Sequence, residues 1–392
     1  MIAMKSFNYS IQTHFYVGPG QFDNLGDIVR DLGKKAFVVT GKNTLSRGGL
    51  QNRLSAMLKN SGVEYVLYTN AMPNPTTIIV DEGSKEFLDS ECDFIIAIGG
   101  GSSIDTAKGI AVAAYHRRPI WDFMDPNKEK EKIIGAYPII AVPTTSGTGS
   151  EADGAAVITN PANSLKPSFK SYYTFPKYSI IDPELVKSLP PSMTASTGVD
   201  AFCQSLECYI GPAATPVSDM FAYESLRLCI DNLQKAYEDG NDIEARSKMA
   251  WAAALSGMAM ATSATSLVHA LEHPLSGKYN ITHGDGLAAL LPSFIEFGYK
   301  YNPKRYAEIT KLFISNVDDI DELALASMLK DEVLRFLEAL GKRLTLKELG
   351  VPKNDIEILA QDAQKTLVGA LKNFQKEVTT QDIVNIYLKS YE

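Results

Sequence analysis

The first half of the chain alternates short β-branched runs with amphipathic stretches, and this alternation restricts the possible folds strongly. The candidate strands are 35–40, 63–68, 93–98, 138–142 and 178–182, and candidate helices lie between them at 43–61, 77–89 and 103–115. Strands that alternate with helices in this way are typical of βαβ units, whose strands build a mainly parallel sheet. We therefore predict an α/β fold for this half.

The second half has a different pattern. From about Ser192 onward, apolar residues recur mostly at spacings of three and four, which predicts helices. Pro190 and Pro191 interrupt regular structure just before this change. With 392 residues, the chain is long enough for two domains that each have a core. We predict an α/β domain over 1–188 and an all-α domain over 189–392.

The charge and the apolar segments exclude several classes of partner. A net charge of −8 argues against a surface for nucleic acid or an anionic membrane, because either needs a basic field. Residues 249–268 carry no charge and reach the length of a membrane span, but serine, threonine and glycine make them only moderately apolar, so we predict a buried central helix. The four cysteines show no CxxC spacing and the N-terminus lacks a secretory signature, so we expect a cytoplasmic protein.

A glycine-rich turn follows the candidate strand 93–98. Its residues are Gly99, Gly100, Gly101, Ser102 and, at the start of the next helix, Asp105. Such a turn exposes backbone N–H groups beside a helix N-terminus, where an anion gains hydrogen bonds and roughly 0.3–1 kcal/mol from the helix dipole. A serine cap with a tight turn is the simpler explanation. Three successive glycines exceed what a cap requires, so we predict a site for a pyrophosphate.

A second loop, 143–151, follows the candidate strand 138–142 and is rich in hydroxyl and small side chains, including Thr144, Thr145 and Thr148. Part of it matches GxGxxA, yet no helix clearly follows, so we discount the dinucleotide fingerprint. A hydrophilic turn is one explanation. Hydroxyls and glycines crowded at the carboxyl end of a strand are more typical of a loop that lines a ligand.

The strand at 35–40 ends in Gly41, Lys42 and Asn43. A NAD-selective site places an acidic residue there to bind the ribose 2′-hydroxyl. A glycine followed by a lysine favours a 2′-phosphate instead. We therefore predict that the cofactor is NADP(H), with NAD as the alternative.

Three of the five histidines, His269, His273 and His283, fall within fifteen residues. Imidazole is the commonest side-chain ligand for zinc and iron. His269 and His273 share a helix face, whereas His283 comes from another segment because proline and glycine interrupt the helix. Asp200, Gln204 and Glu207 share a face of another predicted helix. Asp200 with His269 and His283 gives three ligands and an open position, as in catalytic metal sites.

Four segments make the chain similar to the iron-containing (group III) alcohol dehydrogenase family. They are GGGSSIDTAKG at 99–109, PTTSGTGSE at 143–151, IDPELVKSLPPSMTASTGVDAF at 181–202 and LVHALEHPLSGKYNITHG at 267–284. The resemblance implies an N-terminal dinucleotide-binding domain, a C-terminal helical domain for metal and substrate, and the fold shared with dehydroquinate synthases. It also implies a homodimer or a larger homo-oligomer.

Carried over position by position, the resemblance implies that Asp200, His269 and His283 are metal ligands. It implies that His273 positions substrate or relays a proton. It further implies cofactor contacts from Gly100, Gly101, Ser102, Thr144, Thr145, Thr148 and, near the ribose and nicotinamide, Lys166.

One position departs from the family pattern. The family motif reads DAxxHxxE, and this chain has Gln204 where the family has a fourth metal ligand, a histidine. An amide oxygen is a weaker donor to iron than imidazole. Three outcomes stay open: a three-ligand zinc site, a weakly bound ion whose shell is completed by Gln204 or water, or no metal. We expect a weakened site that holds zinc or iron.

Together these features predict a metal-assisted NAD(P)-dependent alcohol dehydrogenase. The metal binds the oxygen of a small alcohol or aldehyde, hydride passes to or from the nicotinamide, and His273 or water carries the proton. A metal-free carbonyl reductase of the same fold is one alternative, supported by Gln204. A lyase similar to dehydroquinate synthases fits poorly, because the helical half lacks a cluster of Lys and Arg. A nucleotide-binding protein without catalysis is the last alternative.

Overall fold

The computed structural model describes residues 6–317 and 319–392, which form two compact units. The first unit contains residues 11–190 together with 240–254. The second contains the described residues up to Ser10, 191–239 and 255–392. The domain boundary that the sequence predicts after residue 188 stays a prediction.

Within the described residues, the first unit is built on a six-stranded sheet in which every pairing is parallel. In spatial order its strands are β1 (His14–Val17), β8 (Tyr178–Ile181), β5 (Ile139–Pro143), β4 (Phe94–Gly99), β2 (Lys35–Gly41) and β3 (Glu64–Ala71). Five of them match the predicted strands, so the predicted α/β fold is confirmed. The sequence did not predict β1, because this edge strand is exposed or half-exposed and lacks an apolar run.

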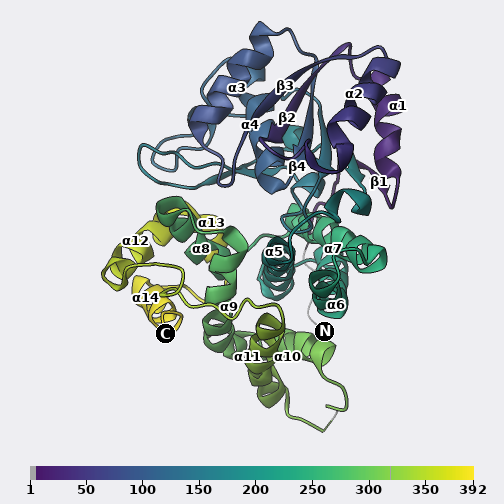
Figure 1. Cartoon of the computed structure of the whole chain (residues 1–392). Helices are drawn as coiled ribbons and strands as arrows, with labels where there is room; N and C mark the ends of the chain where they lie inside the picture. Colours follow the sequence, from purple (N-terminus) through teal and green to yellow (C-terminus); the bar gives the residue numbers. More distant parts are fainter. Residues whose placement is uncertain (1–5, 318) are drawn as a thin grey trace. The chain divides into compact units, whose positions relative to one another are not determined.

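Helices cover both faces of the sheet because successive strand residues point to opposite sides. Phe37 and Ile95 are fully buried against α3 (Thr77–Asp89) and α4 (Gly101–His116). Their neighbours Val38 and Ile96 are fully buried against α1 (Leu25–Arg30) and α2 (Leu50–Asn60). Figure 1 shows these two pairs of helices on opposite sides of the sheet. The unit is therefore a three-layer sandwich with a core on each face.

Helix α2 begins at Leu50 rather than at the predicted residue 43. Gly48 and Gly49 adopt left-handed backbone conformations with φ of 57° and 71°, which a right-handed helix does not continue through. The residues between β2 and α2 are therefore a loop. The remaining short elements of this unit are η1 (Gln21–Asn24), η2 (Arg47–Gly49), η3 (Ile120–Phe123), η4 (Ser150–Ala152), η5 (Tyr172–Thr174), η6 (Pro183–Val186), and the antiparallel pair β6 (Ala155–Val157) and β7 (Ser168–Lys170).

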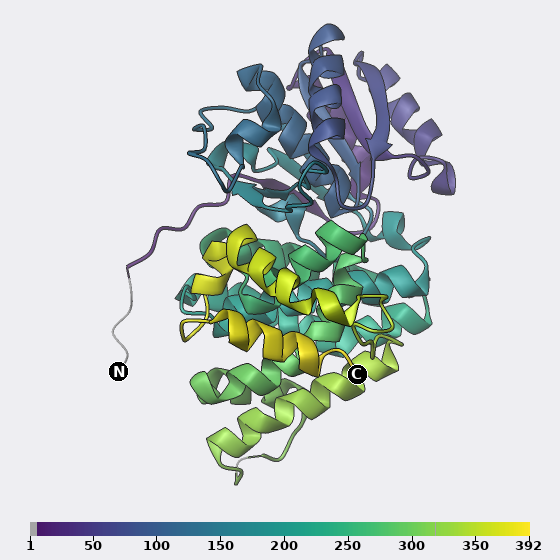
Figure 2. The same cartoon turned by 90° about the vertical axis from the view of Figure 1, so that its left-hand side faces the viewer.

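The second unit is helical, as predicted. Its long helices are α5 (Pro191–Ile210), α6 (Pro216–Glu238), the end of α7 (Ile243–Thr262), α8 (Leu267–Tyr279), α9 (His283–Gly298), α10 (Pro303–Phe313), α11 (Glu322–Ala339), α12 (Ile356–Thr366) and α14 (Thr380–Lys389). Shorter helices are η7 (Tyr299–Tyr301), η8 (Lys353–Asp355) and α13 (Val368–Lys372). Helix α9 packs against α5 and α8. Figure 2 shows the C-terminal helices α12 and α14, in yellow, side by side.

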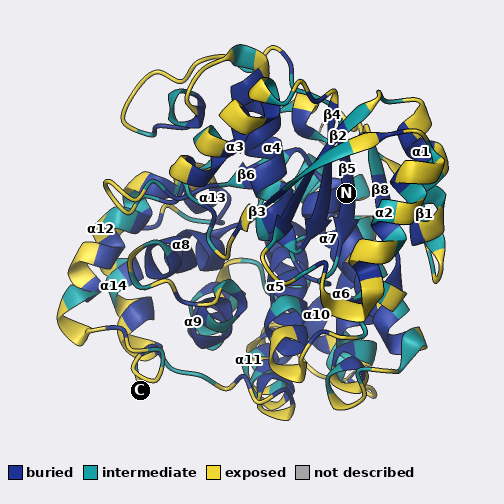
Figure 3. Cartoon of the chain, turned by 45° about the horizontal axis from the view of Figure 1, so that its top comes forward, coloured by how far each residue is buried: buried dark blue, intermediate teal, exposed yellow. Residues whose placement is uncertain are grey.

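The uncharged segment 249–268 forms the end of α7 and the start of α8, so the prediction of one central helix is wrong. Asn373 donates hydrogen bonds to the carbonyl groups of Ala264 (2.7 Å) and Thr265 (3.2 Å), which holds the chain between the two helices in a turn. Most of the segment is buried, as predicted, and Figure 3 shows the neighbouring α8 largely in dark blue. In the described parts of the chain, every helix is too short or too polar to span a membrane.

Candidate active site

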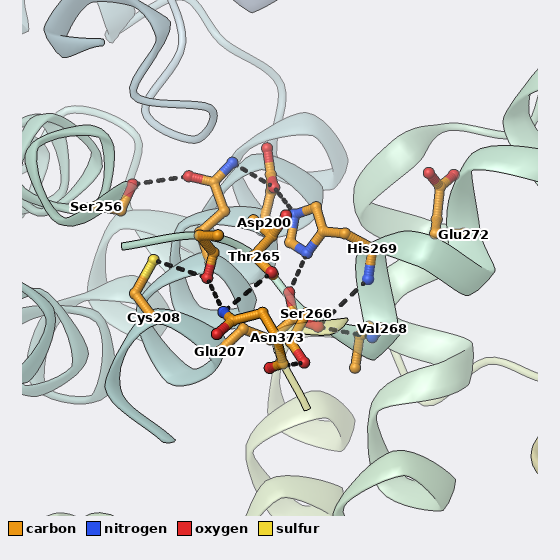
Figure 4. A network of polar contacts seen from close by, with 12 residues as sticks. Asp200, Glu207, Cys208, Ser256, Thr265, Ser266, Val268, His269, Glu272 and Asn373 are labelled. Carbon is orange, nitrogen blue, oxygen red and sulfur yellow. Dashed lines mark hydrogen bonds and ion pairs between the residues drawn. The ribbon is translucent and has the colours of Figure 1, made fainter. Parts of the chain in front are cut away.

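Asp200, His269 and His283 come together in the helical unit from three helices, α5, α8 and α9. One potential ligand atom of each lies within 4.8 Å of the others. Asp200 Oδ1 is 3.5 Å from His269 Nε2 and 3.7 Å from His283 Nε2. Asp200 and His269 are buried, and His283 is half-buried. Figure 4 shows His269 and Asp200 pointing toward each other.

Glu207 holds His269 in place from further along α5. Its Oε2 accepts a hydrogen bond from His269 Nδ1 (2.5 Å), and its Oε1 accepts from the backbone N–H groups of Val268 (2.6 Å) and His269 (3.4 Å). These N–H groups lie in the first turn of α8, where a helix has unpaired donors and a carboxylate is stabilised. Glu207 is fully buried. A carboxylate on Nδ1 turns Nε2 toward Asp200, as is usual for metal-binding histidines.

Glu272 orients His283 in the same way, because His283 Nδ1 donates a hydrogen bond to the fully buried Glu272 Oε2. The residue after His283 allows a close approach of two helices. A Cβ atom at Gly284 would lie 1.9 Å from the backbone oxygen of Ser196 on α5. Only glycine therefore lets the start of α9 come this near to α5, and the approach brings His283 to Asp200.

The side chains fit a divalent cation. Nε2 of His269 is buried and has no hydrogen-bond partner among the described residues. Burial lowers the pKa of His269, but the charges of Glu207 and Asp200 outweigh burial and raise the pKa to about 10 in the metal-free protein. Two imidazole nitrogens beside a carboxylate form the donor set that zinc or iron takes, with one position left open.

Gln204 lies one turn after Asp200 on α5, and its amide nitrogen is turned toward the carboxylate. Nε2 donates a hydrogen bond to Asp200 Oδ1 (2.9 Å), and Oε1 accepts one from Ser256 Oγ (2.9 Å). Because an ionised carboxylate only accepts hydrogen bonds, these two partners fix the orientation of the amide. In this arrangement the amide oxygen is engaged by Ser256, and direct ligation by Gln204 stays a prediction.

His273 lies beside the cluster. Its ring centroid is 5.6 Å from that of His283, and its side chain is buried. The two orienting carboxylates, Glu207 and Glu272, were not among the predicted site residues. Glu207 could have been found, since it shares a helix face with Asp200, and Glu272 directly precedes His273.

In the α/β unit, the two predicted loops lie against each other because they follow adjacent strands, with Gly99 of β4 opposite Pro143 of β5. A Cβ atom at Gly100 would lie 3.0 Å from the side chain of Thr145. A Cβ atom at Gly101 would lie 2.4 Å from that of Thr148. The glycines thus make room for the threonines. The structure brings Gly99, Gly100 and Gly101 next to Thr144, Thr145 and Thr148, and a cofactor bound by these residues stays a prediction.

The carboxylate of Asp105, another predicted cofactor residue, is hydrogen-bonded to other residues of the protein. It accepts hydrogen bonds from Ser150 Oγ (2.6 Å) and from the backbone N–H of Val157 (2.9 Å). Burial raises the pKa of Asp105 to about 6, although Lys108 lies nearby. Lys108 donates to Ser150 Oγ and Asp153 Oδ1, each at 2.8 Å. This network ties the second loop to α4, and a direct contact of Asp105 with the cofactor stays a prediction.

Two other predicted cofactor residues, Lys166 and Ser102, make hydrogen bonds within the same unit. Lys166 is buried and its Nζ donates a hydrogen bond to Asn74 Oδ1 (2.8 Å). Ser102 lies in the first turn of α4, and its carbonyl group accepts a hydrogen bond from Thr106 Oγ1 (2.7 Å). Contacts of Lys166 and Ser102 with a cofactor stay predictions.

A cavity of about 190 Å³ opens after the carboxyl ends of β2 and β5. Its lining includes Thr44, Thr144, Arg47 and Lys187. Lys187 is paired with Glu184 (3.0 Å), whereas Arg47 has no ion-pair partner among the residues that the structure describes. The cavity therefore offers one unpaired cation to an anionic ligand.

The predicted residues Gly41, Lys42 and Asn43 precede this lining in the chain and are not part of it. Sequence reasoning missed Arg47, because the predicted helix 43–61 placed this residue inside a helix. In the structure Arg47 lies in the loop that the left-handed Gly48 and Gly49 create.

Two family models match the chain over most of its length. The one described as "Iron-containing alcohol dehydrogenase" matches residues 12–183. The one described as "Fe-containing alcohol dehydrogenase family, C-terminal" matches residues 194–391.

Known proteins resemble the chain from end to end. The NAD-dependent methanol dehydrogenase of Bacillus methanolicus is 33% identical over 97% of this chain and 98% of its own. The 1,3-propanediol dehydrogenase of Citrobacter freundii is 32% identical over 93% of this chain and 94% of its own. The structure of an archaeal halo-thermophilic alcohol dehydrogenase from a Red Sea brine pool is similar with a TM-score of 0.94 at 35% identity, over 100% of both chains.

Proposed function

This chain belongs to the iron-containing alcohol dehydrogenase family, and from that premise we propose that it reduces a small aldehyde with NADPH at a divalent metal held in the helical unit. The family makes the chain an NAD(P)-dependent alcohol dehydrogenase, an oxidoreductase that acts on CH–OH groups. The observation that carries the proposal is the convergence of Asp200, His269 and His283 around a buried imidazole nitrogen with no hydrogen-bond partner in the described chain.

The chemistry that a divalent ion supplies when bound there is Lewis acidity toward the oxygen of an alcohol or carbonyl. Asp200, His269 and His283 would hold such an ion, and three protein ligands would leave a position for that oxygen. Glu207 and Glu272 hold the two imidazoles with Nε2 turned toward Asp200. These contacts fix the ligand geometry before substrate arrives.

His273 is the residue that we assign to proton transfer. It is buried, and its ring lies beside that of His283. An imidazole at this place can donate a proton to the carbonyl oxygen once hydride has been added to the carbonyl carbon, and can accept the hydroxyl proton in the reverse reaction.

We expect metal binding to be weakened rather than lost, because Gln204 contributes a hydrogen bond to Asp200 and its oxygen is engaged by Ser256. Protein purified without chelator should contain zinc or iron, and EDTA should lower its activity. Metal analysis combined with assays before and after EDTA treatment tests this expectation. Protein that contains no metal and keeps its full activity in EDTA would contradict it.

The orientation of Gln204 also favours a second candidate function, a metal-free carbonyl reductase of the same fold. The amide already donates a hydrogen bond to Asp200, and this bond partly offsets the cost of burying the negative charge of the carboxylate without a cation. His273 and nearby polar groups then bind the carbonyl. Full activity of metal-free protein, lost on His273→Asn, would identify this function.

Two residues support the preference for NADP(H): Gly41 at the carboxyl end of β2, and Arg47 in the segment that follows this strand. Gly41 offers no carboxylate to a ribose 2′-hydroxyl. Arg47 lines the neighbouring cavity without an ion-pair partner in the described chain, and a guanidinium suits a phosphate because it can donate two parallel hydrogen bonds. The Bacillus methanolicus relative is named for NAD, so the preference is proposed for this chain alone.

Steady-state kinetics test the cofactor preference. We expect kcat/KM to be higher with NADPH than with NADH, and Arg47→Ala to reduce this advantage about tenfold, the loss of roughly one charge-assisted hydrogen bond. The rate with NADH should change little. Lys59→Ala is the matched variant, because this exposed lysine on α2 lies outside the cavity lining. Equal efficiencies with the two cofactors in the wild-type protein would overturn the preference.

The substrate and assembly follow from the relatives. Two of them are named for methanol and for 1,3-propanediol, which supports a short alcohol or aldehyde as the substrate. We infer a homodimer or a larger homo-oligomer from the family resemblance. Light scattering of the purified protein measures the assembly, and a monomer at assay concentrations would contradict this inference.

A further inference from the structure

We infer that Lys342 is a positioning residue for the metal site, acting through Asp285 and Ser196 to set the separation of His283 from Asp200. The inference rests on the proposed function, since it assigns a role toward the same three ligands. The residues involved lie outside the ligand set and outside the predicted site residues.

The three side chains meet at one carboxylate oxygen. Lys342 Nζ and Ser196 Oγ each lie 2.6 Å from Asp285 Oδ1. The side chain of Lys342 is 9% exposed and that of Asp285 is 21% exposed, so solvent screens the ion pair only partly. A lysine held this way loses much of its hydration, and the carboxylate becomes its main compensation.

Ser196 and Asp285 lie close in the chain to two of the proposed metal ligands. Ser196 precedes Asp200 by one turn of α5, and Asp285 follows His283 by two residues in the first turn of α9. A hydrogen bond between Ser196 and Asp285 therefore joins the helix segments that carry two of the ligands. The contact of Gly284 with the Ser196 backbone oxygen lies between these two points and leaves the helices no room to move closer.

Lys342 adds a third anchor from another part of the unit. It follows α11, and its backbone N–H donates to the carbonyl group of Leu337 (2.7 Å) at the end of that helix. Because the backbone of Lys342 is bonded to the end of α11, its ammonium group holds the Asp285 carboxylate in a fixed position. Without this charge, the partly buried carboxylate of Asp285 gains by turning toward water, and the first turn of α9, with His283, moves away from Asp200.

An ion pair between α11 and the other end of α9 serves as the matched control. Lys330 Nζ lies 2.6 Å from Glu296 Oε2, and both side chains are about a third exposed, at 35% and 36%. Glu296 lies at the far end of α9 from His283 and also pairs with Lys389. Loss of Lys330 removes a cation that joins α11 to α9 without touching the end of α9 that carries His283.

The experiment measures zinc affinity of the metal-depleted full chain by competition with a chromogenic chelator. Lys342→Met is expected to weaken zinc binding roughly 10- to 100-fold, the range typical of residues that orient metal ligands. Lys330→Met should bind zinc as the wild type does, and Lys342→Arg, which keeps the charge, should recover most of the affinity. If Lys342→Met fails to fold, Ser196→Ala removes one hydrogen bond from the same oxygen and should weaken binding in the same direction.

Two results would overturn the inference. Unchanged zinc affinity in a folded Lys342→Met protein would do so while leaving the proposed function intact. Equal losses of zinc affinity in Lys342→Met and Lys330→Met would also do so, because they would show that both variants act through the general stability of the helical unit. Wild-type protein that binds neither zinc nor ferrous iron would contradict the metal-assisted function itself. The positioning role is then tested by NMR of metal-free protein. The chemical shifts of the His283 imidazole must change in Lys342→Met and stay unchanged in Lys330→Met.

Discussion

The loops after β4 and β5 keep their shape through backbone and small side chains, whereas Asp200, His269 and His283 are held by buried carboxylates. In the loops, Gly100 and Gly101 lie where any Cβ would press on a threonine. In the helical unit, Glu207 and Glu272 each fix one imidazole. The difference teaches that the first region is sensitive to added atoms and the second to the removal of a hydrogen-bond acceptor.

The largest effect is expected when one of the three proposed metal ligands is removed. Asp200→Ala should lower kcat/KM by a factor on the order of 1,000 or more, because Lewis-acid stabilisation contributes several kcal/mol to such a reaction. NADPH affinity, measured by fluorescence titration, should stay near the wild-type value. Asp231→Asn, at an exposed ion pair on α6, is the control. A parallel loss of NADPH binding would break the separation between the two regions.

Glu151, the buried acid at the end of the second loop, tests whether that region also depends on charge. Burial raises the pKa of Glu151 to about 7. A carboxyl group with a raised folded pKa contributes stability below its unfolded pKa, about 4.5, and loses that contribution as the pH rises through 7. Relative to wild type, Glu151→Gln should therefore gain on the order of 3 kcal/mol of unfolding free energy between pH 4 and pH 9.

Urea unfolding at several pH values measures this difference. The exposed Glu338→Gln is the control, since its carboxylate is 64% exposed and should show no such trend. A difference between Glu151→Gln and wild type that does not vary with pH would mean that Glu151 titrates as an ordinary surface acid.

Adding one atom to the first loop should affect the cofactor and spare the metal. A Cβ at Gly101 comes within 2.4 Å of Thr148, so Gly101→Ala must move the second loop. A displacement of about 1 Å at such a site costs on the order of 100-fold in efficiency. Gly369→Ala, whose Cβ would meet nothing within 4 Å, is the matched control. Unchanged KM for NADPH in Gly101→Ala would show that the loops do not hold the cofactor.

The smallest effect is expected at an orienting carboxylate. Glu207→Gln keeps an oxygen for the N–H groups of Val268 and His269 but offers no charge to the imidazole. Zinc affinity should fall about 10-fold, at the low end of the range for such residues. Glu224→Gln, in an exposed pair with Arg227, is the control. Loss of helix content in Glu207→Gln, seen by circular dichroism, with unchanged zinc affinity would assign Glu207 to the helix start alone.

The contrast between the loops and the three side chains of the helical unit also explains which features the sequence predicts. The strands and the two loops are local patterns, and five strands, both loops and the helical second half appear where we expected them. Asp200, His269 and His283 were also identified, because histidines so close together are conspicuous. Their separations depend on long-range contacts such as Gly284 with Ser196, which no local pattern contains.

Other features escaped prediction for physical reasons. β1 is too exposed to show an apolar run. Gly48 and Gly49 end the expected helix over 43–61 early, and this places Arg47 at the cavity. Asp105 was predicted to contact the cofactor from the start of a helix, yet Ser150 and Val157, about fifty residues away, satisfy its carboxylate. Partners so distant in the chain are visible only once the fold is known.

The two bonds of Glu207 have a consequence for how this site can change over evolutionary time. One oxygen starts helix α8 and the other aims the imidazole of His269. A substitution that discards the ion while keeping the protein folded must therefore spare this acid. We expect descendants that lose the metal to alter Asp200 or the histidines first, and to retain Glu207 as a remnant that still nucleates the helix.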